Sequence, residues 1–125
     1  MDVLVVDDEE DLRVLLDLYL RGRGHSPVLA GSAGEARAAL AGQDFGAMLL
    51  DVTLPDEDGP SLVRSLREQG NLPERLVLVS AVRPAVLVDL AAELDAVHLA
   101  KPFNIVTLDE VLGPLLSPAD DAGAT

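Results

Sequence analysis

The chain has 125 residues, of which 49% are hydrophobic, enough for one compact domain around one core and too few for two. Its formal net charge of −13 repels nucleic-acid phosphates and anionic bilayers, so we expect neither direct nucleic-acid binding nor membrane association. Because cysteine, a basic leader and a bilayer-length apolar run are all missing from the sequence, disulfides and thiolate metal sites are excluded and a cytoplasmic protein is expected.

Five short apolar runs alternate with stretches of helical period. Apolar residues throughout a short run are typical of strands that are buried on both faces. These runs are residues 3–6, 27–29, 47–50, 76–79 and 96–99. Apolar residues three and four apart predict amphipathic helices between and after the runs. These helices are expected over residues 12–20, 33–40, 60–69, 84–94 and from 105 onward.

Several helix ends carry their own signals. Ser32 and Glu35 match a capping box, and Asn104 is placed to cap the last helix. Gly113-Pro114 is expected to shorten or kink that helix, because proline lacks the amide hydrogen and clashes with the preceding turn. Residues 117–125 are small and polar without apolar spacing, which predicts a disordered tail or the start of a linker after a domain of residues 1–116.

Five strand–helix units in a row predict a doubly wound α/β fold. A parallel sheet needs crossover connections, so helices cover both of its faces, and the flavodoxin-like strand order 2-1-3-4-5 is expected. Ligands bind such sheets beyond the carboxyl ends of the strands. The predicted strands end on Asp7-Asp8, Asp51, Ser80 and, after the fifth run, Lys101. These polar side chains are therefore expected to converge.

The expected cluster of carboxylates points to a divalent cation. Two unit charges about 4 Å apart repel by roughly 4 kcal/mol at an effective dielectric of about 20, and a cation relieves this repulsion. Oxygen-only ligation by Asp7, Asp8 and Asp51 favours Mg²⁺, with Mn²⁺ as a possible substitute.

The same cluster suits phosphoryl transfer to a carboxylate. An aspartate can attack phosphorus when nearby groups neutralise the charge of the transferred group. Lys101 offers a compact positive charge and Ser80 a hydroxyl donor. Lys101 is also the only lysine among nine basic residues. Arginine would bring a broad planar fork where a narrow point charge is needed.

In this order and spacing the residues resemble a known family, the receiver domain of bacterial two-component response regulators. The motifs that carry the resemblance are Asp7-Asp8, Asp51 with Pro55 and Asp58-Gly59, Ser80-Ala81 and Lys101-Pro102-Phe103. The resemblance implies a phosphoacceptor switch. It also implies that the chain is not a multiple-turnover enzyme, although it would catalyse its own phosphoryl transfer and could catalyse its own dephosphorylation.

The resemblance also implies roles for single residues. Asp51 would accept the phosphoryl group from a sensor histidine kinase or a phosphotransfer protein. Asp8 would bind Mg²⁺ directly, Asp7 often through water, and the backbone carbonyl of Thr53 would complete the protein ligands. Ser80 and Lys101 would turn toward the phosphoryl group. The output would be altered binding of an unknown downstream protein or of an attached output domain.

One position departs from the family pattern. His98 stands three residues before Lys101, where receivers usually carry an aromatic switch residue. A partly buried structural histidine and a conformational or pH-sensitive switch both fit the sequence, which favours the first.

Other interpretations stay open. The acids after the first strand could have no role beyond capping the following helix. Asp56, Glu57 and Asp58 could be a solvated loop. Ser80 could simply hydrogen-bond a backbone group at the end of its strand. As a whole, the chain could be a pseudo-receiver that binds partners without being phosphorylated. A haloacid-dehalogenase-like phosphohydrolase uses a similar inventory, but in that family the acid pair comes last along the chain.

Overall fold

The computed structural model describes residues 1–116, in which strands and helices alternate. The strands are β1 (Asp2–Val6), β2 (Ser26–Ala30), β3 (Ala47–Asp51), β4 (Arg75–Ser80) and β5 (Val97–Ala100). The helices are α1 (Glu10–Gly22), α2 (Ala33–Gly42), α3 (Gly59–Gln69), α4 (Pro84–Leu94) and α5 (Ile105–Leu116). The tail or linker predicted for residues 117–125 lies outside the described residues.

The strands form one parallel sheet in the order β2-β1-β3-β4-β5, which confirms the predicted doubly wound fold. β1 lies between β2 and β3, so the chain winds outward from β1 in both directions. In the shared register Val6 pairs with Leu50, which brings the carboxyl ends of β1 and β3 side by side. This is the point of order reversal at which such sheets bind ligands.

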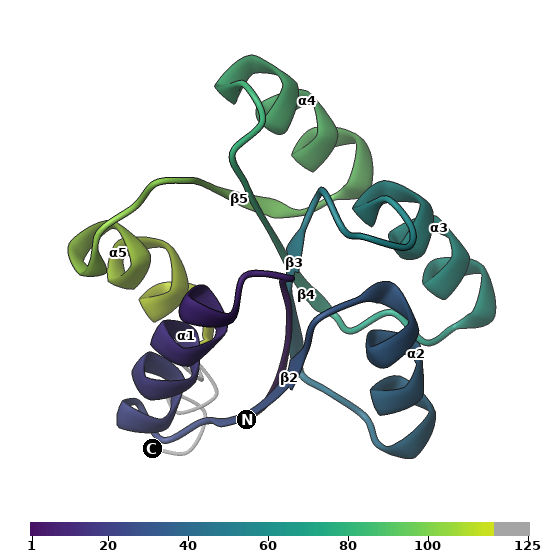
Figure 1. The fold of residues 1–125 in the computed structure, drawn as a ribbon, viewed down its shortest axis with the longest axis horizontal. Coiled ribbons are helices and arrows are strands. Elements are labelled where there is room, and N and C mark those ends of the chain that lie inside the picture. Colours follow the sequence, from purple (N-terminus) through teal and green to yellow (C-terminus); the bar gives the residue numbers. More distant parts are fainter. Residues whose placement is uncertain (117–125) are drawn as a thin grey trace.

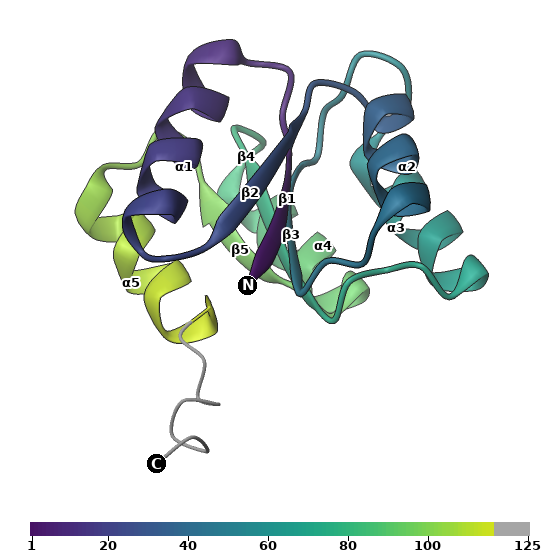
Figure 2. The same cartoon turned by 90° about the horizontal axis from the view of Figure 1, so that it is seen from below.

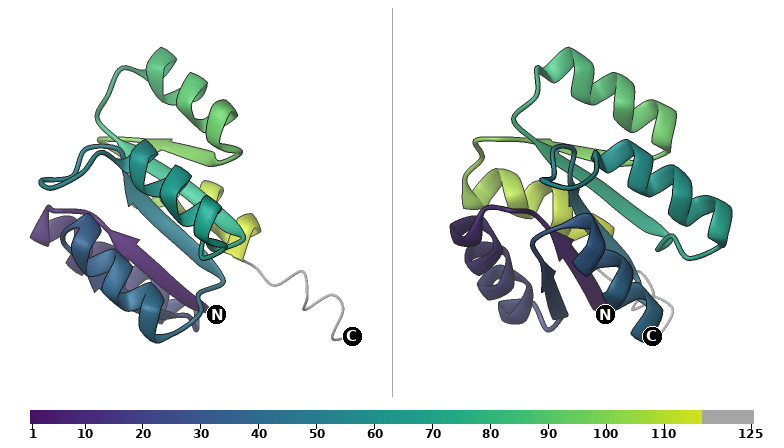
Figure 3. Two further views of the ribbon diagram at one scale, coloured as in Figure 1. Left: turned by 90° about the vertical axis from the view of Figure 1, so that its right-hand side faces the viewer. Right: turned by 45° about the vertical axis from the view of Figure 1, so that its right-hand side comes forward.

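Two helical layers cover the sheet, with α1 and α5 on one face and α2, α3 and α4 on the other (Figure 1, Figure 2). Figure 3 shows the second layer facing the viewer. Alternate side chains of a strand enter opposite layers: Val3 and Val5 pack with α1 and α5, whereas Leu4 and Val6 pack with the other three helices. The central strands β1, β3 and β4 therefore have a core on both sides, whereas the edge strands β2 and β5 are partly exposed, so the prediction of burial on both faces is wrong for these two.

Side chains cap several helices. Ser32 Oγ accepts the amide hydrogen of Glu35 at 3.1 Å, and Asn104 Oδ1 accepts that of Thr107 at 2.9 Å, as the sequence predicts. The reciprocal arm of the capping box differs, because Glu35 Oε1 accepts from the amide of Gly31 rather than from Ser32. No helix among residues 1–116 combines the length and the apolarity needed to cross a bilayer.

Two details of the helices correct the predictions. α5 runs through Gly113 to Leu116 with Pro114 inside it, so the helix is not shortened there, whereas the alternative of a kink stays a prediction. Because Pro114 lies in the last turn, its missing amide hydrogen costs the helix a single backbone bond. Leu15, which the helical spacing placed on the buried face of α1, is 41% exposed, while Leu16 and Leu20 fill the core.

Candidate functional site

The polar strand ends converge on one rim of the sheet, as predicted. A hollow of about 400 Å³ opens there, and its lining comes from the loops after β1, β3, β4 and β5. The lining residues are Asp8, Glu9, Asp51, Thr53, Ser80, Ala81, Val82 and Lys101. The parallel sheet alone accounts for this convergence, because all of its strands end at the same edge.

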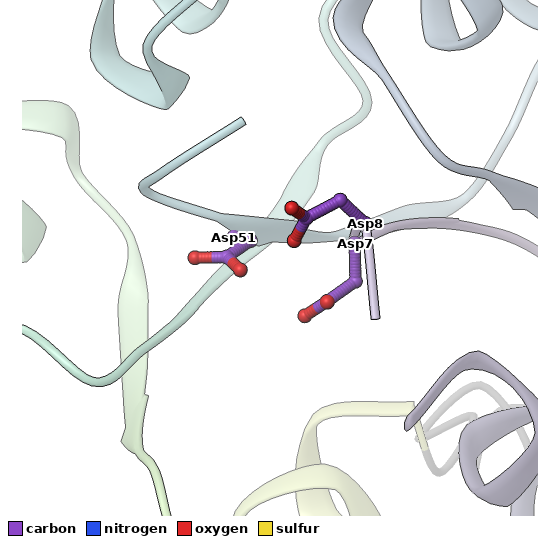
Figure 4. A group of neighbouring side chains, drawn as sticks. All are labelled: Asp7, Asp8 and Asp51. Atoms are coloured by element: carbon purple, nitrogen blue, oxygen red, sulfur yellow. The ribbon is translucent and has the colours of Figure 1, made fainter. Parts of the chain in front are cut away.

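Three carboxylates meet at the centre of the rim (Figure 4). One oxygen from each of Asp7, Asp8 and Asp51 lies within 4.8 Å of the others. Asp7 and Asp51 are buried and Asp8 is exposed, so the cluster opens to solvent on the Asp8 side. Two buried anions at this distance repel each other strongly unless a cation lies between or beside them.

Lys101 supplies a cation to this cluster. Its Nζ atom lies 2.9 Å from Asp7 Oδ2, 3.0 Å from Asp51 Oδ2 and 2.6 Å from Glu9 Oε1. Burial lowers the pKa of Lys101, but the close contacts with the three carboxylates outweigh burial and raise it overall. The side chain therefore stays a positive charge at any physiological pH.

Asp51 lies at the end of β3 and is 6% exposed. Its Oδ1 accepts the amide hydrogen of Thr53 at 3.0 Å and its Oδ2 accepts from Lys101. Burial raises the pKa of Asp51 above its usual value, the Thr53 and Lys101 hydrogen bonds oppose the rise, and the charge of Asp7 adds to it. Asp51 is thus an oriented carboxylate whose negative charge is poorly solvated.

Asp7 is buried and only partly satisfied. Its Oδ1 accepts the amide hydrogen of Glu9 at 2.9 Å. Its Oδ2 makes no hydrogen bond among residues 1–116, although Nζ of Lys101 lies 2.9 Å from it. The cap position of α1 is Glu9, with no side-chain cap bond among the described contacts, so capping does not account for Asp7 or Asp8, whereas Glu10 and Asp11 lie in the first turn of the helix.

The remaining predicted residues divide into two groups. Thr53 and Ser80 line the hollow, and Ser80 Oγ accepts the amide hydrogen of Val82 at 3.2 Å, while its own hydrogen has no acceptor among residues 1–116. His98 does not join the site: it lies on β5 and is exposed. The preference for a partly buried structural histidine is therefore wrong, because its side chain alternates away from the buried Leu99.

The sequence analysis missed three acidic residues that make specific contacts. Glu9 binds Lys101, and Asp56 and Glu57 bind α2. Asp56 and Asp58 are exposed loop residues, as predicted, but Asp56 and Glu57 also hydrogen-bond to α2. Asp58 caps α3 by accepting the amide hydrogen of Ser61 at 2.7 Å. For Asp58, the spacing to the proline near the helix start was a usable signal. For the others, none of the signals used identifies the partner.

A close backbone contact explains the glycine after Asp58. A Cβ atom on Gly59 would lie 2.7 Å from the carbonyl oxygen of Asp51 and 2.9 Å from the Cα of Val52. The start of α3 therefore packs directly on the backbone that carries Asp51. Only glycine allows this approach.

Comparison with known proteins identifies the family of the chain. Residues 3–112 match the family described as "Response regulator receiver domain". The chain belongs to this family. Among curated relatives, the transcriptional regulatory protein AruR of Pseudomonas aeruginosa is 46% identical over 109 residues, with 82% of this chain and 43% of AruR aligned. Protein PetR of Rhodobacter capsulatus is 37% identical over 102 residues, with the same two shares.

Solved receivers share the fold. A response regulator receiver protein from Pseudomonas putida superposes with a TM-score of 0.77 at 34% identity, covering 90% of this chain and 95% of that one. The chain spans about 43% of the length of the curated relatives it matches, so it corresponds to their receiver portion.

The residues at the rim fit a divalent cation, which receiver domains bind through their acidic cluster. The donor set is made of oxygen atoms, as Mg²⁺ requires. One buried carboxylate oxygen, Asp7 Oδ2, lacks a hydrogen-bond donor within the described part of the chain. Asp8 keeps the cluster open to solvent, which suits an ion that retains several waters.

Proposed function

We propose that this receiver domain is a phosphoacceptor switch in which Asp51 takes a phosphoryl group from the phosphohistidine of a sensor kinase or phosphotransfer protein. The observation that carries the proposal is the contact of Lys101 with Asp51 beside the cluster of Asp7, Asp8 and Asp51. One nucleophile, a metal-binding acid set and one fixed cation are what transfer to a carboxylate needs.

In the proposed step, a carboxylate oxygen of Asp51 forms a bond to phosphorus while the bond from phosphorus to the imidazole nitrogen breaks. Thr53 donates its amide hydrogen to Oδ1 of Asp51, which fixes the rotation of the carboxylate before the reaction. Lys101 and the Ser80 hydroxyl lie in the same hollow and would donate to phosphoryl oxygens.

We infer that Mg²⁺, or Mn²⁺ in its place, is held by Asp8 and Asp51 directly, by the Thr53 carbonyl, and by Asp7 through water. When bound, the ion supplies charge neutralisation for the carboxylates and the transferred group. Asp8 is exposed beside two buried acids, which supports its role as the ligand that an incoming ion meets first.

The output is expected to be altered binding of a downstream protein or of an attached output domain. His98 is exposed on β5, so we propose that it is accessible to this partner.

An intact-mass experiment tests the phosphorylation proposal. Wild type and Asp51→Asn are incubated with Mg²⁺ and either acetyl phosphate or a phosphorylated kinase. We expect one added phosphoryl group on wild type and none on the variant. No adduct with any donor would favour the pseudo-receiver. Steady hydrolysis of unrelated phosphate esters would favour the phosphohydrolase and contradict a switch that does not turn over.

A further inference from the structure

The loop that follows Asp51 is fastened to helix α2. Asp56 Oδ1 accepts the amide hydrogen of Ala33 at 2.9 Å, and its Oδ2 accepts that of Gly34 at the same distance. These amides belong to the first turn of α2, where backbone hydrogens have no partner within the helix. They also lower the pKa of Asp56, so the carboxylate is charged whenever the domain is folded near neutral pH.

A second tie joins the same loop to α2. Arg37 Nη2 donates to both carboxylate oxygens of Glu57, at 2.9 and 3.0 Å. Arg37 Nη1 also donates to Ser65 Oγ of α3 at 3.2 Å, so one guanidinium connects the loop to two helices. Both charged side chains, Arg37 and Glu57, are partly buried, so solvent screens this ion pair less than it screens a fully exposed one.

The other parts of the loop are fixed at the phosphoacceptor end. The Thr53 amide donates to Asp51, and the Gly59 amide donates to the carbonyl oxygen of Val52 at 2.8 Å. Thr53 therefore lies in a segment that is pinned to β3 at one end and to α2 in the middle. Its carbonyl is the one proposed metal ligand that comes from the backbone, so its position depends on the loop as a whole.

We propose that Asp56 and Glu57 are positioning residues that hold this loop against α2 so that the Thr53 carbonyl and the Asp51 carboxylate face a common divalent cation. The inference rests on the proposed function, and it assigns to α2 a role in cation affinity. Residues that orient metal ligands without touching the metal commonly affect affinity strongly.

Metal titration of matched variants tests the inference. Asp56→Ala removes both bonds to α2, Asp56→Asn keeps one acceptor oxygen, and Glu57→Gln weakens the second tie. Ser32→Ala is the control, because Ser32 caps the same end of α2 without touching the loop. Mg²⁺ affinity is measured by calorimetry, and hydrogen exchange of the Ala33 and Gly34 amides reports the ties directly.

Asp56→Ala is expected to weaken Mg²⁺ binding about tenfold, Asp56→Asn less, and Ser32→Ala not at all. In Asp56→Ala, the Mg²⁺ concentration that gives half of the maximal initial phosphorylation rate is expected to rise, while the maximal rate stays that of wild type. A purely structural role would instead lower stability in Asp56→Ala and Ser32→Ala alike. Equal Mg²⁺ affinity in wild type and Asp56→Ala overturns the inference.

The same experiment distinguishes failure of the proposed phosphoacceptor function from failure of the positioning role of Asp56 and Glu57. A wild type that neither binds Mg²⁺ nor takes up phosphoryl overturns the proposed function and this inference together. If the wild type binds Mg²⁺ and takes up phosphoryl, and the variants bind Mg²⁺ with the same affinity, only the inference is overturned. If Asp56→Ala does not fold, Glu57→Gln decides, because it leaves both backbone bonds of Asp56 in place: unchanged Mg²⁺ affinity in that variant counts against the inference.

Discussion

Nζ of Lys101 lies 3.0 Å from Oδ2 of Asp51, although 50 residues separate them in the sequence. Their strands are not neighbours, since β4 lies between β3 and β5. The lysine side chain therefore crosses the end of β4, where the backbone amide of Lys101 donates to the carbonyl oxygen of Ser80 at 2.8 Å. This anchor fixes the base of the side chain and lets its tip reach Asp51 and Asp7.

Replacement of Lys101 tests how much its contact with Asp51 contributes to the phosphorylation rate. Lys101→Ala is expected to lower the phosphorylation rate with acetyl phosphate on the order of a hundredfold, as loss of a fixed transition-state donor commonly does. Lys101→Arg keeps the charge but not the compact shape, so a smaller loss is expected. Direct Mg²⁺ titration checks that the acid cluster is retained. A wild-type rate in Lys101→Ala would contradict the role.

Glu9 competes for the same lysine. It contacts Lys101 at 2.6 Å and is itself 61% exposed. Glu9→Gln is expected to speed phosphorylation roughly two- to fivefold, since an exposed ion pair contributes about 0.2–1 kcal/mol. Glu10→Gln is the control, because that acid also lies at the start of α1 and makes no such contact in the described structure. A slower Glu9→Gln would show that Glu9 positions Lys101 instead.

The raised pKa of Asp51 predicts a pH-dependent stability. A carboxyl whose pKa is higher in the folded state binds its proton more tightly there, so its contribution to folding falls as pH rises through that range. Without metal, Asp51→Asn is therefore expected to unfold at a higher temperature than wild type at neutral pH. The difference should shrink as the pH is lowered toward the ordinary aspartate value. Thermal unfolding in EDTA at a series of pH values measures it.

Metal binding should stabilise the fold through Asp8. Mg²⁺ at about one hundred times its dissociation constant is expected to add about 2.7 kcal/mol to the free energy of unfolding. Asp8→Asn should lose most of this gain. In EDTA the same variant should match wild type within about 0.5 kcal/mol, because Asp8 is exposed. An unchanged response to Mg²⁺ in Asp8→Asn would remove Asp8 from the ligand set.

Because Gly59 packs on the backbone of Asp51 and Val52, any side chain at position 59 is expected to lower the stability of the fold. Gly59→Ala places a methyl group against the backbone of Asp51 and Val52, and a loss of about 1–3 kcal/mol of stability is expected. Gly42→Ala is the matched control, because a Cβ there meets nothing within 4 Å. Chemical denaturation compares the two. A stable Gly59→Ala would mean that the start of α3 moves freely away from β3.

Much of the site followed from the ends of apolar runs. Asp7, Asp8, Asp51, Ser80 and Lys101 each follow a strand, and parallel strands end at one edge, so their convergence needed no coordinates. The pairing of Glu57 with Arg37 and of Asp56 with α2 could not be predicted in this way. Such contacts depend on how a loop folds over a helix, and the 20 to 23 residues between partners carry no periodic signal.

The sequence by itself determined the order of strands and helices, the doubly wound sheet and the acidic cluster with its lysine, because these depend on local periodicity and on the ends of strands. Only the tertiary structure decided that Asp7 is buried while Asp8 is exposed, that His98 faces solvent, and that the loop after Asp51 is tied to α2. Burial and pairing arise from which surfaces the helices cover, and that is a property of the packed layers rather than of any one segment.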